Sequence, residues 1–346
     1  KNEKYGQVDF LNPEVTMLPR LLQKAGYKTG HFGKWHLTFK DFFDVAPLPE
    51  DYGYDEAAVF LGPGRQTTHV QLFDDAIDFI KRNKDNRFFA NIWIHETHVA
   101  HHPTEEAMNK FSHLDEQQQV YSAVIWDADR RIGKILQTLE DLDIEDETLV
   151  IFSSDNGPEN TGTERAKKKG TGYGKYYSVG VTDGLKGRKR HLFEGGVRLP
   201  FIVRWPGHTP AGDINKDTVL AAVDLLPTFC SIAGVKLPDD YQPDGENMMS
   251  AFLGNKIKRS KPLFWEWKGK RGGFKWPRLA IRDGKWKLVK DEEDMVLYNL
   301  ERDREETTDI SDEYPETVKR LNYKLDNWKK SLPDKVETNY DAAREE

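Results

Sequence analysis

Three consecutive residues, Asp155, Asn156 and Gly157, are the first candidates for chemistry in this chain of 346 residues. They follow residues 148–152 (TLVIF), whose β-branched and apolar side chains predict a fully buried strand. In open α/β sheets, ligands bind beyond the carboxyl ends of the strands. A carboxylate and an amide oxygen at that point can face a hard divalent cation, while glycine lets the chain turn away. The alternative is an ordinary Asn-Gly turn after a strand.

A second pair of candidates, Lys34 and His36, follows a strand predicted over residues 27–32. In extended backbone the two side chains point the same way, because one residue separates them. A cation beside a proton carrier suits an anionic substrate that is cleaved. The alternative is a surface lysine next to a hydrogen-bonded histidine.

Four closely spaced histidines follow a third predicted strand, residues 88–94; they are His95, His98, His101 and His102. A zinc site is disfavoured, because no cysteine accompanies them and the helical spacing of a zinc protease is absent. His98, at the strand exit, is the best placed to act as a general acid. We expect the others to be surface or supporting groups.

The segment 158–191 is rich in glycine and basic residues and predicts a long loop, a kind of segment that is often functional. Its end is densely basic, with Lys186, Arg188, Lys189, Arg190 and His191. Such a run is usually a solvated surface. In an acidic protein, beside a cation site, a local positive patch favours a phosphate or sulfate ester.

An aromatic and basic cluster lies further along the chain; it comprises Trp265, Trp267, Trp276, Lys268, Lys270 and Arg271. Tryptophan faces stack on sugar rings, but they also fill protein cores, and the sequence leaves both readings open. The single cysteine, Cys230, lies in a predicted helix and is expected to be a buried, inert thiol.

The elements that must position these residues alternate along the chain. Helices are predicted around residues 16–25, 70–80 and 120–139, each before a strand, and residues 38–66 are predicted to be loop. This order favours right-handed crossovers and a mainly parallel sheet between helices. The carboxyl ends of parallel strands meet at one edge, so all the strand-exit candidates are expected to converge there; they are Lys34, His36, His98, Asp155 and Asn156.

The composition changes after residue 255. A strand at 200–205 and a helix at 224–234 complete the first part, and short strands at 279–282, 286–290 and 296–300 then predict an antiparallel sheet, followed by a helix at 315–331. We therefore predict an α/β domain over residues 1–255 and a smaller α+β subdomain over 256–346.

Composition excludes some classes of function. The net charge of −7 argues against a general nucleic-acid binder, and no apolar run approaches the roughly 20 residues that a membrane helix needs. One cysteine permits no internal disulfide and does not decide the compartment.

Several segments together resemble the formylglycine-dependent sulfatases. Residues 26–37 (GYKTGHFGKWHL) resemble the second signature of that family. Further segments match in the family's order, namely 154–157 (SDNG), 186–189 (KGRK), 193–200 (FEGGVRLP), 224–228 (DLLPT), 279–288 and 297–300. The similarity covers essentially the whole chain, and the segment around His98 is most similar to enzymes of the N-acetylgalactosamine-6-sulfatase type.

The resemblance implies an alkaline-phosphatase-like α/β fold, one Ca²⁺ and a sulfated carbohydrate substrate. By matched position, Asp155 and Asn156 would be calcium ligands, and Lys34 and Lys189 would hold sulfate oxygens. It also implies a periplasmic or extracellular location.

The resemblance also implies how protons move. His98 would protonate the leaving sugar oxygen, and His36 would take a proton from the covalent hemiacetal so that sulfate is expelled. We add Arg188, His191 and Trp267 as further substrate-binding candidates.

The chain departs from the family in one respect. Sulfatases oxidise the first residue of a Cys/Ser-x-Pro/Ala-x-Arg motif to formylglycine and carry an aspartate pair that completes the calcium shell; both normally precede the helix that starts here near Thr16. Neither is present, and Cys230 is in the wrong context. We therefore expect a sulfatase that lacks its first portion, binds calcium poorly, is inactive alone and has an exposed sheet edge or gap.

Two other functions stay open. A phosphatase or phosphonate hydrolase of the same superfamily could share the metal site. A non-catalytic protein that binds sulfated glycans would explain the absent nucleophile, although it would not need both an acid and a base.

Overall fold

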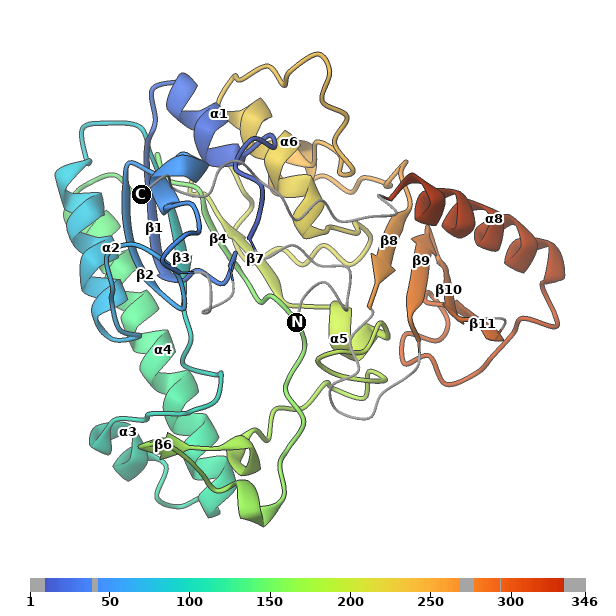
Figure 1. The fold of residues 1–346 in the computed structure, drawn as a ribbon, viewed down its shortest axis with the longest axis horizontal. Helices are drawn as coiled ribbons and strands as arrows, with labels where there is room; N and C mark the ends of the chain where they lie inside the picture. The colour runs from blue at the N-terminus through green and yellow to red at the C-terminus, as the bar shows by residue number, and fades with distance from the viewer. Residues whose placement is uncertain (1–9, 39–42, 268–276, 293, 333–346) are drawn as a thin grey trace.

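The computed structural model describes residues 10–38, 43–267, 277–292 and 294–332. A larger α/β part carries most of the helices, and a smaller part holds an antiparallel sheet under one long helix (Figure 1). The predicted fold class, with a parallel sheet, helices and a C-terminal antiparallel subdomain, is confirmed. In the described part of the chain, no helix is long and apolar enough to cross a membrane.

Three parallel strands form the sheet of the larger part, in the order β2–β1–β3. They are β1 (Lys28–Lys34), β2 (Glu56–Phe60) and β3 (Phe88–Trp93), and α2 (Gln71–Arg82) and α4 (Glu116–Asp141) pack beside them. The amphipathic pattern of α2 buries its apolar side against β1 and β3. A core cluster results, with Phe32, Ala58, Leu72, Phe73, Ala76, Phe79, Ile80 and Leu139.

Strand β2 lies inside residues 38–66, where we expected only loop, so that expectation is wrong. The strand begins with glutamate and two alanines, residue types that are depleted in strands, and this composition hides it. Hydrogen bonding to β1 stabilises the extended conformation that the local sequence does not favour.

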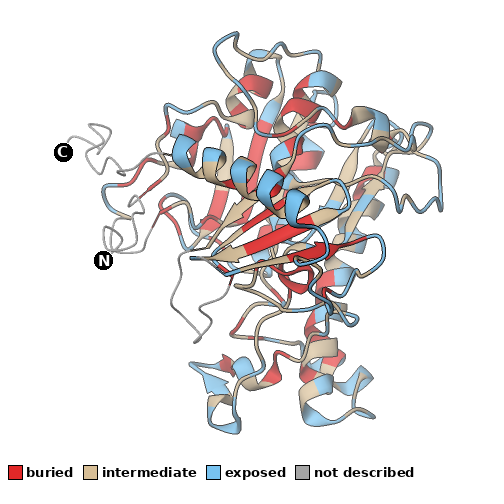
Figure 2. Ribbon diagram, turned by 90° about the vertical axis from the view of Figure 1, so that its right-hand side faces the viewer, coloured by how far each residue is buried: buried red, intermediate tan, exposed pale blue. Residues whose placement is uncertain are grey.

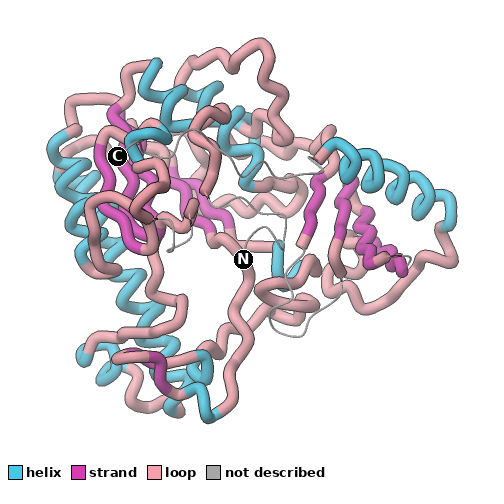
Figure 3. Tube along the Cα trace, viewed as in Figure 1, coloured by secondary structure: helices cyan, strands magenta, loops and turns pink. Residues whose placement is uncertain are grey.

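The strand before Asp155 differs from the prediction in its partner and in its burial, since none of its residues is buried. Strand β4 (Val150–Ser153) pairs antiparallel with β7 (Phe201–Arg204) in a separate two-stranded sheet and is not part of the parallel one. Strand β3 is an edge strand that pairs with β1 alone. Figure 3 shows the two groups of strands and the long loops between them. The order of elements predicts neighbouring strands, but hydrogen-bond partners are decided only in three dimensions.

The first helix also differs in detail. Helix α1 (Leu18–Lys24) begins after Met17, and Thr16 does not cap it; Pro19 occupies its first turn as expected. It packs against α6 (Leu225–Ile232), in which Cys230 is buried. Burial raises the pKa of this thiol, which is consistent with an inert group.

The predicted long loop of residues 158–191 contains only short elements. They are η4 (Glu164–Ala166), β5 (Lys168–Lys169), β6 (Gly172–Tyr173) and η5 (Lys175–Tyr177). This segment lies beside α4 and near α3 (Glu105–Lys110), at the lower end of the view in Figure 1. Two backbone hydrogen bonds between His101 and Tyr173, of 2.8 and 2.9 Å, attach it to the chain that leaves β3.

The remaining short elements of the larger part connect these segments. They are η3 (Pro49–Tyr52), α5 (Glu194–Val197), η6 (Ala222–Asp224) and α7 (Met249–Phe252).

The C-terminal sheet has the order β11–β10–β9–β8 and is antiparallel throughout. Its strands are β8 (Leu263–Glu266), which we did not predict, β9 (Leu279–Asp283), β10 (Trp286–Asp291) and β11 (Asp294–Asn299). Helix α8 (Pro315–Ser331) covers one face, as its apolar spacing predicts. Figure 2 shows buried residues concentrated along the strands and the inner sides of the helices.

Candidate active site

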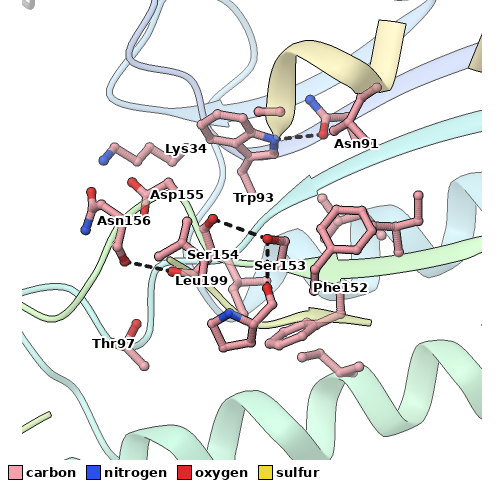
Figure 4. Close-up of a pocket in the computed structure, with 18 of the residues that line it drawn as sticks. Lys34, Asn91, Trp93, Thr97, Phe152, Ser153, Ser154, Asp155, Asn156 and Leu199 are labelled. Atoms are coloured by element: carbon pink, nitrogen blue, oxygen red, sulfur yellow. Dashed lines mark hydrogen bonds between the residues drawn. The ribbon is translucent and has the colours of Figure 1, made fainter. Parts of the chain in front are cut away.

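One cavity of about 3880 Å³ is lined by residues of both β3 and β4. Apolar side chains line much of it, including Trp93 and Phe152, which are 44% and 41% exposed. Charged side chains gather at the end where the strands exit (Figure 4). Most of the predicted site residues line this cavity, namely Lys34, His36, His98, Asp155, Asn156, Lys189, His191 and Trp267.

Lys34 and His36 reach the cavity in different ways. Lys34 is the last residue of β1, and its ammonium group points towards Asp155 and Asn156 in Figure 4. His36 has a φ of 48°, so the expectation of extended backbone through this residue is wrong. Partial burial, followed by the charges of Lys34 and Lys189, lowers the pKa of His36. The positive charges of both lysines therefore disfavour protonation of His36, although this residue lies beyond the end of β1.

His98 follows β3 with its ring oriented by the backbone. The Nδ1–H group donates a hydrogen bond of 2.7 Å to the Val99 carbonyl oxygen, which leaves Nε2 for another partner. Burial, and then the charge of Lys189, lowers the pKa of His98 to about 4. The imidazole is therefore neutral at neutral pH in the free protein.

The other histidines of that stretch have supporting positions. His95 lies 4.5 Å from His98 between ring centres, and neither of its buried ring nitrogens has a hydrogen-bond partner in the described residues. His101 is fully buried and shares a hydrogen bond of 3.2 Å with Ser178. Within the described ranges, no cluster of three or more His, Cys, Asp or Glu side chains could hold a metal ion.

Lys189 lies on a segment that we call the basic loop, residues 186–196. Its backbone N–H donates to the Pro158 carbonyl oxygen at 3.0 Å, and its Nζ atom lies 4.0 Å from Glu159 Oε2. Burial lowers the pKa of Lys189, an effect that Glu159 and Asp155 oppose and that the charges of Arg190 and Lys34 add to. The Lys189 ammonium group is thus partly shielded from water, and both positively and negatively charged side chains surround it at the cavity.

Glu159 is a site residue that the sequence did not single out, and its partner is Arg190 of the predicted basic run. Arg190 forms two hydrogen bonds to the Glu159 carboxylate, of 2.5 and 2.9 Å. Burial would raise the pKa of Glu159, but Arg190 outweighs it and holds the value at about 2. The sequence could have predicted this ion pair, because Glu159 stands two positions after Gly157 and the basic run needs a negatively charged partner.

Of two further residues predicted to bind substrate, the structure places one at the cavity and the other outside it. Arg188 does not line the cavity, since its Nη1 atom donates to the Glu159 carbonyl oxygen at 3.2 Å. The prediction that Arg188 binds substrate therefore has no support here. His191 does line the cavity and accepts a hydrogen bond of 3.2 Å from the Arg188 backbone at Nδ1.

Trp267 combines the two readings that the sequence left open. It lines the cavity and also packs against the core cluster beneath the C-terminal sheet. Trp265 likewise lines the cavity and packs against that cluster. The remaining predicted members, Trp276, Lys268, Lys270 and Arg271, lie outside the described residues.

Asp155 and Asn156 have the oxygen atoms that calcium prefers as ligands, but there are too few of them to complete its shell. The Asn156 Nδ2 group donates to the Gly157 carbonyl oxygen at 2.8 Å, which leaves the amide oxygen for another partner. Together they supply two oxygen ligands, whereas Ca²⁺ takes six to eight. The described residues therefore offer too few oxygen ligands for a complete calcium shell.

Comparisons with known proteins identify the family. The sulfatase family model matches residues 1–235, and the model for the C-terminal part of N-sulphoglucosamine sulphohydrolase matches residues 187–331. Human N-acetylgalactosamine-6-sulfatase is 29% identical over 281 residues, which cover 72% of this chain and 50% of that protein. A sulfatase of Formosa agariphila is 30% identical over 292 residues, covering 74% and 49%. The chain thus spans about half the length of the curated relatives that it matches.

Solved structures agree with this assignment. Ps i-CgsB, crystallised with k-i-k-neocarrahexaose, aligns with a TM-score of 0.78 and 25% identity over 94% of this chain and 78% of its own. The PsFucS1 sulfatase from Pseudoalteromonas sp. has the same fold, with a TM-score of 0.73 and 20% identity over 97% and 77%. The chain belongs to the sulfatase family.

Proposed function

We propose that this chain supplies the sulfate-binding part of a sulfuric ester hydrolase that acts on a sulfated carbohydrate. The observation that carries the proposal is the meeting of Lys34, Lys189, His36 and His98 beside Asp155 in one cavity of a sulfatase-family chain. The carbohydrate part rests on similarity to N-acetylgalactosamine-6-sulfatase and to a protein crystallised with a neocarrahexaose. Family resemblance adds a location in the periplasm or outside the cell.

The two lysines would hold the sulfate group. Lys34 and Lys189 reach the cavity from a strand exit and from a loop, and the charge of Lys34 acts on Lys189, so one anion would contact both. Lys189 is half-desolvated before substrate arrives, and its charge therefore acts through less water than a surface lysine does. This arrangement stabilises negative charge that develops on sulfate oxygens as the ester bond breaks.

The two histidines would handle protons. His98 uses Nδ1 for the hydrogen bond to Val99, so Nε2 would be the ring nitrogen that meets the substrate, and the low pKa of His98 arises partly from the positive charge of Lys189. A bound sulfate ester neutralises that charge, so binding raises the pKa of His98 and prepares it to protonate the leaving oxygen. His36 lies where it can accept a proton in the complementary step.

Calcium and the nucleophile need groups beyond these. When bound, calcium would stabilise sulfate oxygens, and Asp155 and Asn156 would hold it with further ligands. The sequence contains no Cys/Ser-x-Pro/Ala-x-Arg motif, and we assign no step to a nucleophile in this chain. We expect it to bind the ester without turning it over.

The test measures binding and hydrolysis with the same protein. Calorimetry should show that N-acetylgalactosamine 6-sulfate binds in a way that N-acetylgalactosamine does not, and incubation of an aryl sulfate with the chain and Ca²⁺ should give no hydrolysis. Equal binding of the two sugars would refute the sulfate site. Clear hydrolysis of the aryl sulfate would refute the inactivity of the chain alone.

Two alternatives have specific support. A preference for the 6-phosphate over the 6-sulfate of the same sugar would favour a phosphatase or phosphonate hydrolase, because the same cations hold either anion. A non-catalytic glycan-binding protein is favoured by the absence of the nucleophile motif. In that case, replacing His98 would leave sugar affinity unchanged at every pH.

A further inference from the structure

A buried cluster of charged side chains joins the C-terminal sheet to the basic loop. Lys287 and Glu306 are each 0% exposed, and Glu194 is 1% exposed. The Lys287 Nζ atom lies 2.8 Å from Glu194 Oε1 and 3.0 Å from Glu306 Oε1. Arg282 adds a second positive charge, with Nη1 3.6 Å from Glu194 Oε2. Buried charges are costly unless they are paired, so the cluster holds these elements in one arrangement.

The two carboxyl groups of the cluster differ in how readily they bind a proton. Burial raises the pKa of Glu306, although Lys287 opposes this. For Glu194 burial also disfavours the charge, but Lys287 and Arg282 outweigh it and hold the pKa below its usual range. Glu194 is therefore the main counter-ion of Lys287.

Both ends of the basic loop attach to the C-terminal subdomain. At one end, the Glu194 N–H group donates to Glu306 Oε2 at 2.5 Å. At the other, Lys186 Nζ donates to the Tyr298 hydroxyl at 3.0 Å and to the Glu306 carbonyl oxygen at 3.3 Å. Phe193 packs in one core cluster with Tyr298, and the Lys186 ammonium lies 4.5 Å from the centre of the Phe193 ring.

The loop between these ends lies directly against the candidate site. The Gly157 N–H group donates to the Gly196 carbonyl oxygen at 3.0 Å, and the Lys189 N–H group donates to Pro158 at 3.0 Å. A Cβ atom on Gly157 would lie 1.9 Å from the Gly195 carbonyl oxygen, so the two backbone segments are too close to admit any side chain at residue 157. A displacement of the loop would move both Lys189 and the turn that follows β4.

We propose that Lys287, acting through Glu194 and Glu306, is a positioning residue that fixes the basic loop and thereby places Lys189 for sulfate binding. The inference rests on the proposed function for what Lys189 binds. It assigns to the C-terminal subdomain a role in building the site of the larger part. Lys287 itself does not line the cavity.

The test uses Lys287→Met, which removes the charge and keeps the length of the side chain. Lys290→Met is the matched control, because Lys290 lies on the same strand but pairs with Asp326 outside the cluster, at 2.9 Å. Hydrogen exchange should speed up by about tenfold or more in residues 186–196 of Lys287→Met and stay unchanged in α2. Affinity for N-acetylgalactosamine 6-sulfate should fall by about tenfold or more, since small misplacements of a binding group are costly.

An NMR titration of His98 separates positioning from general stability. Because Lys189 helps to lower the pKa of His98, a loosened loop should move that pKa from about 4 upward towards 6.5. Lys290→Met should leave it in place. Unchanged exchange, affinity and His98 titration in a folded Lys287→Met variant would overturn the proposal.

A milder variant covers the case in which Lys287→Met does not fold. Glu306→Gln keeps an acceptor for the Glu194 N–H group but removes one charge, and it should change the three measurements in the same direction by about threefold. No change in Glu306→Gln would also overturn the proposal. If the unmodified chain fails to bind the sulfated sugar, the proposed function fails, while the exchange and His98 measurements still decide whether Lys287 positions the loop.

Discussion

The parallel sheet and the basic loop both deliver cations to one cavity, but they are held in different ways. The sheet delivers Lys34 at the end of β1, a strand that is hydrogen-bonded on both sides and covered by an apolar core. The loop delivers Lys189 from a segment with little regular structure, fixed by a buried ion cluster and by contacts with the C-terminal sheet. The comparison teaches that one site can rest on two kinds of support, one local and one remote.

A second contrast lies within the larger part itself. Strand β1 is the central strand of its sheet, and most of its residues are buried. Strands β3 and β4 instead face the cavity with apolar side chains that remain partly exposed. Partly exposed apolar groups contribute less to stability than buried ones, because less of their surface leaves water. The core of the parallel sheet and the walls of the cavity should therefore respond differently to mutation.

The largest expected effect comes from breaking the core under the sheet. Phe79 is 1% exposed and packs against Phe32, so Phe79→Ala should lower the free energy of unfolding by about 3–5 kcal/mol. Phe152 is 41% exposed, and Phe152→Ala should cost about 1 kcal/mol or less. Urea denaturation measures both. Equal losses would show that the cavity side is as well supported as the core.

The next effect addresses the cation that the loop supplies. Lys189→Ala should weaken binding of a sulfated monosaccharide by about 1.5–3 kcal/mol, because a charge-assisted hydrogen bond to the anion is lost. Calorimetry measures the change. Lys168→Ala, a surface lysine that does not line the cavity, serves as the control and should have no effect. A normal affinity in Lys189→Ala would place the anion elsewhere.

The pH dependence of stability should report on a histidine that is buried in the parallel sheet. His31 on β1 accepts a hydrogen bond from Asn91 at Nδ1 and donates from Nε2 to the Lys34 carbonyl oxygen, each at 3.1 Å. Burial lowers its pKa from 6.5 to about 4, so the unfolded chain binds more protons between these values. Stability should therefore be full above pH 6.5 and decline as pH falls towards 4.

Urea midpoints across that pH range check the expectation, and NMR should show His31 titrating well below 6.5 in the native state. Stability that rises as the pH falls through this range would contradict it.

The smallest expected effect concerns a lysine on the hairpin of β5 and β6. Lys169 lines the cavity and lies close enough to His98 to lower its pKa, whereas its neighbour Lys168 does not line the cavity. Lys169→Ala should weaken binding of a disulfated sugar by a factor of about 2–5 relative to Lys168→Ala, as expected for an exposed charge pair. Calorimetry with mono- and disulfated sugars measures the difference. Equal losses for the two sugars would exclude a contact between Lys169 and a second sulfate.

Much of the fold could be predicted because its elements carry local signals. The apolar spacing in α2, α4 and α8 and the β-branched run of β4 fix these elements whatever surrounds them. Strand β2 escaped prediction because its alanines carry no such signal. Strand β8 escaped because its tryptophan, Trp265, is interpreted from the sequence as part of an aromatic and basic cluster. The partner of β4 escaped as well, since pairing depends on segments far apart in the sequence.

The candidate site divides in the same way. Asp155, Asn156, Lys34 and His98 follow strands, and a strand exit can be located from the sequence alone. The pairing of Glu159 with Arg190, and the turning of Arg188 away from the cavity, depend on a loop whose shape comes from contacts elsewhere. Local patterns do not record such contacts.

By itself, the sequence determined the residue types of the site, the order of the elements and the resemblance to sulfatases, because these are properties of neighbouring residues. Only the tertiary structure decided which strands pair, which basic side chains reach the cavity and that Lys287 supports Lys189 from another sheet. The physical reason is that a buried charge must find its counter-ion in three dimensions, and here Lys287 lies 93 positions from Glu194.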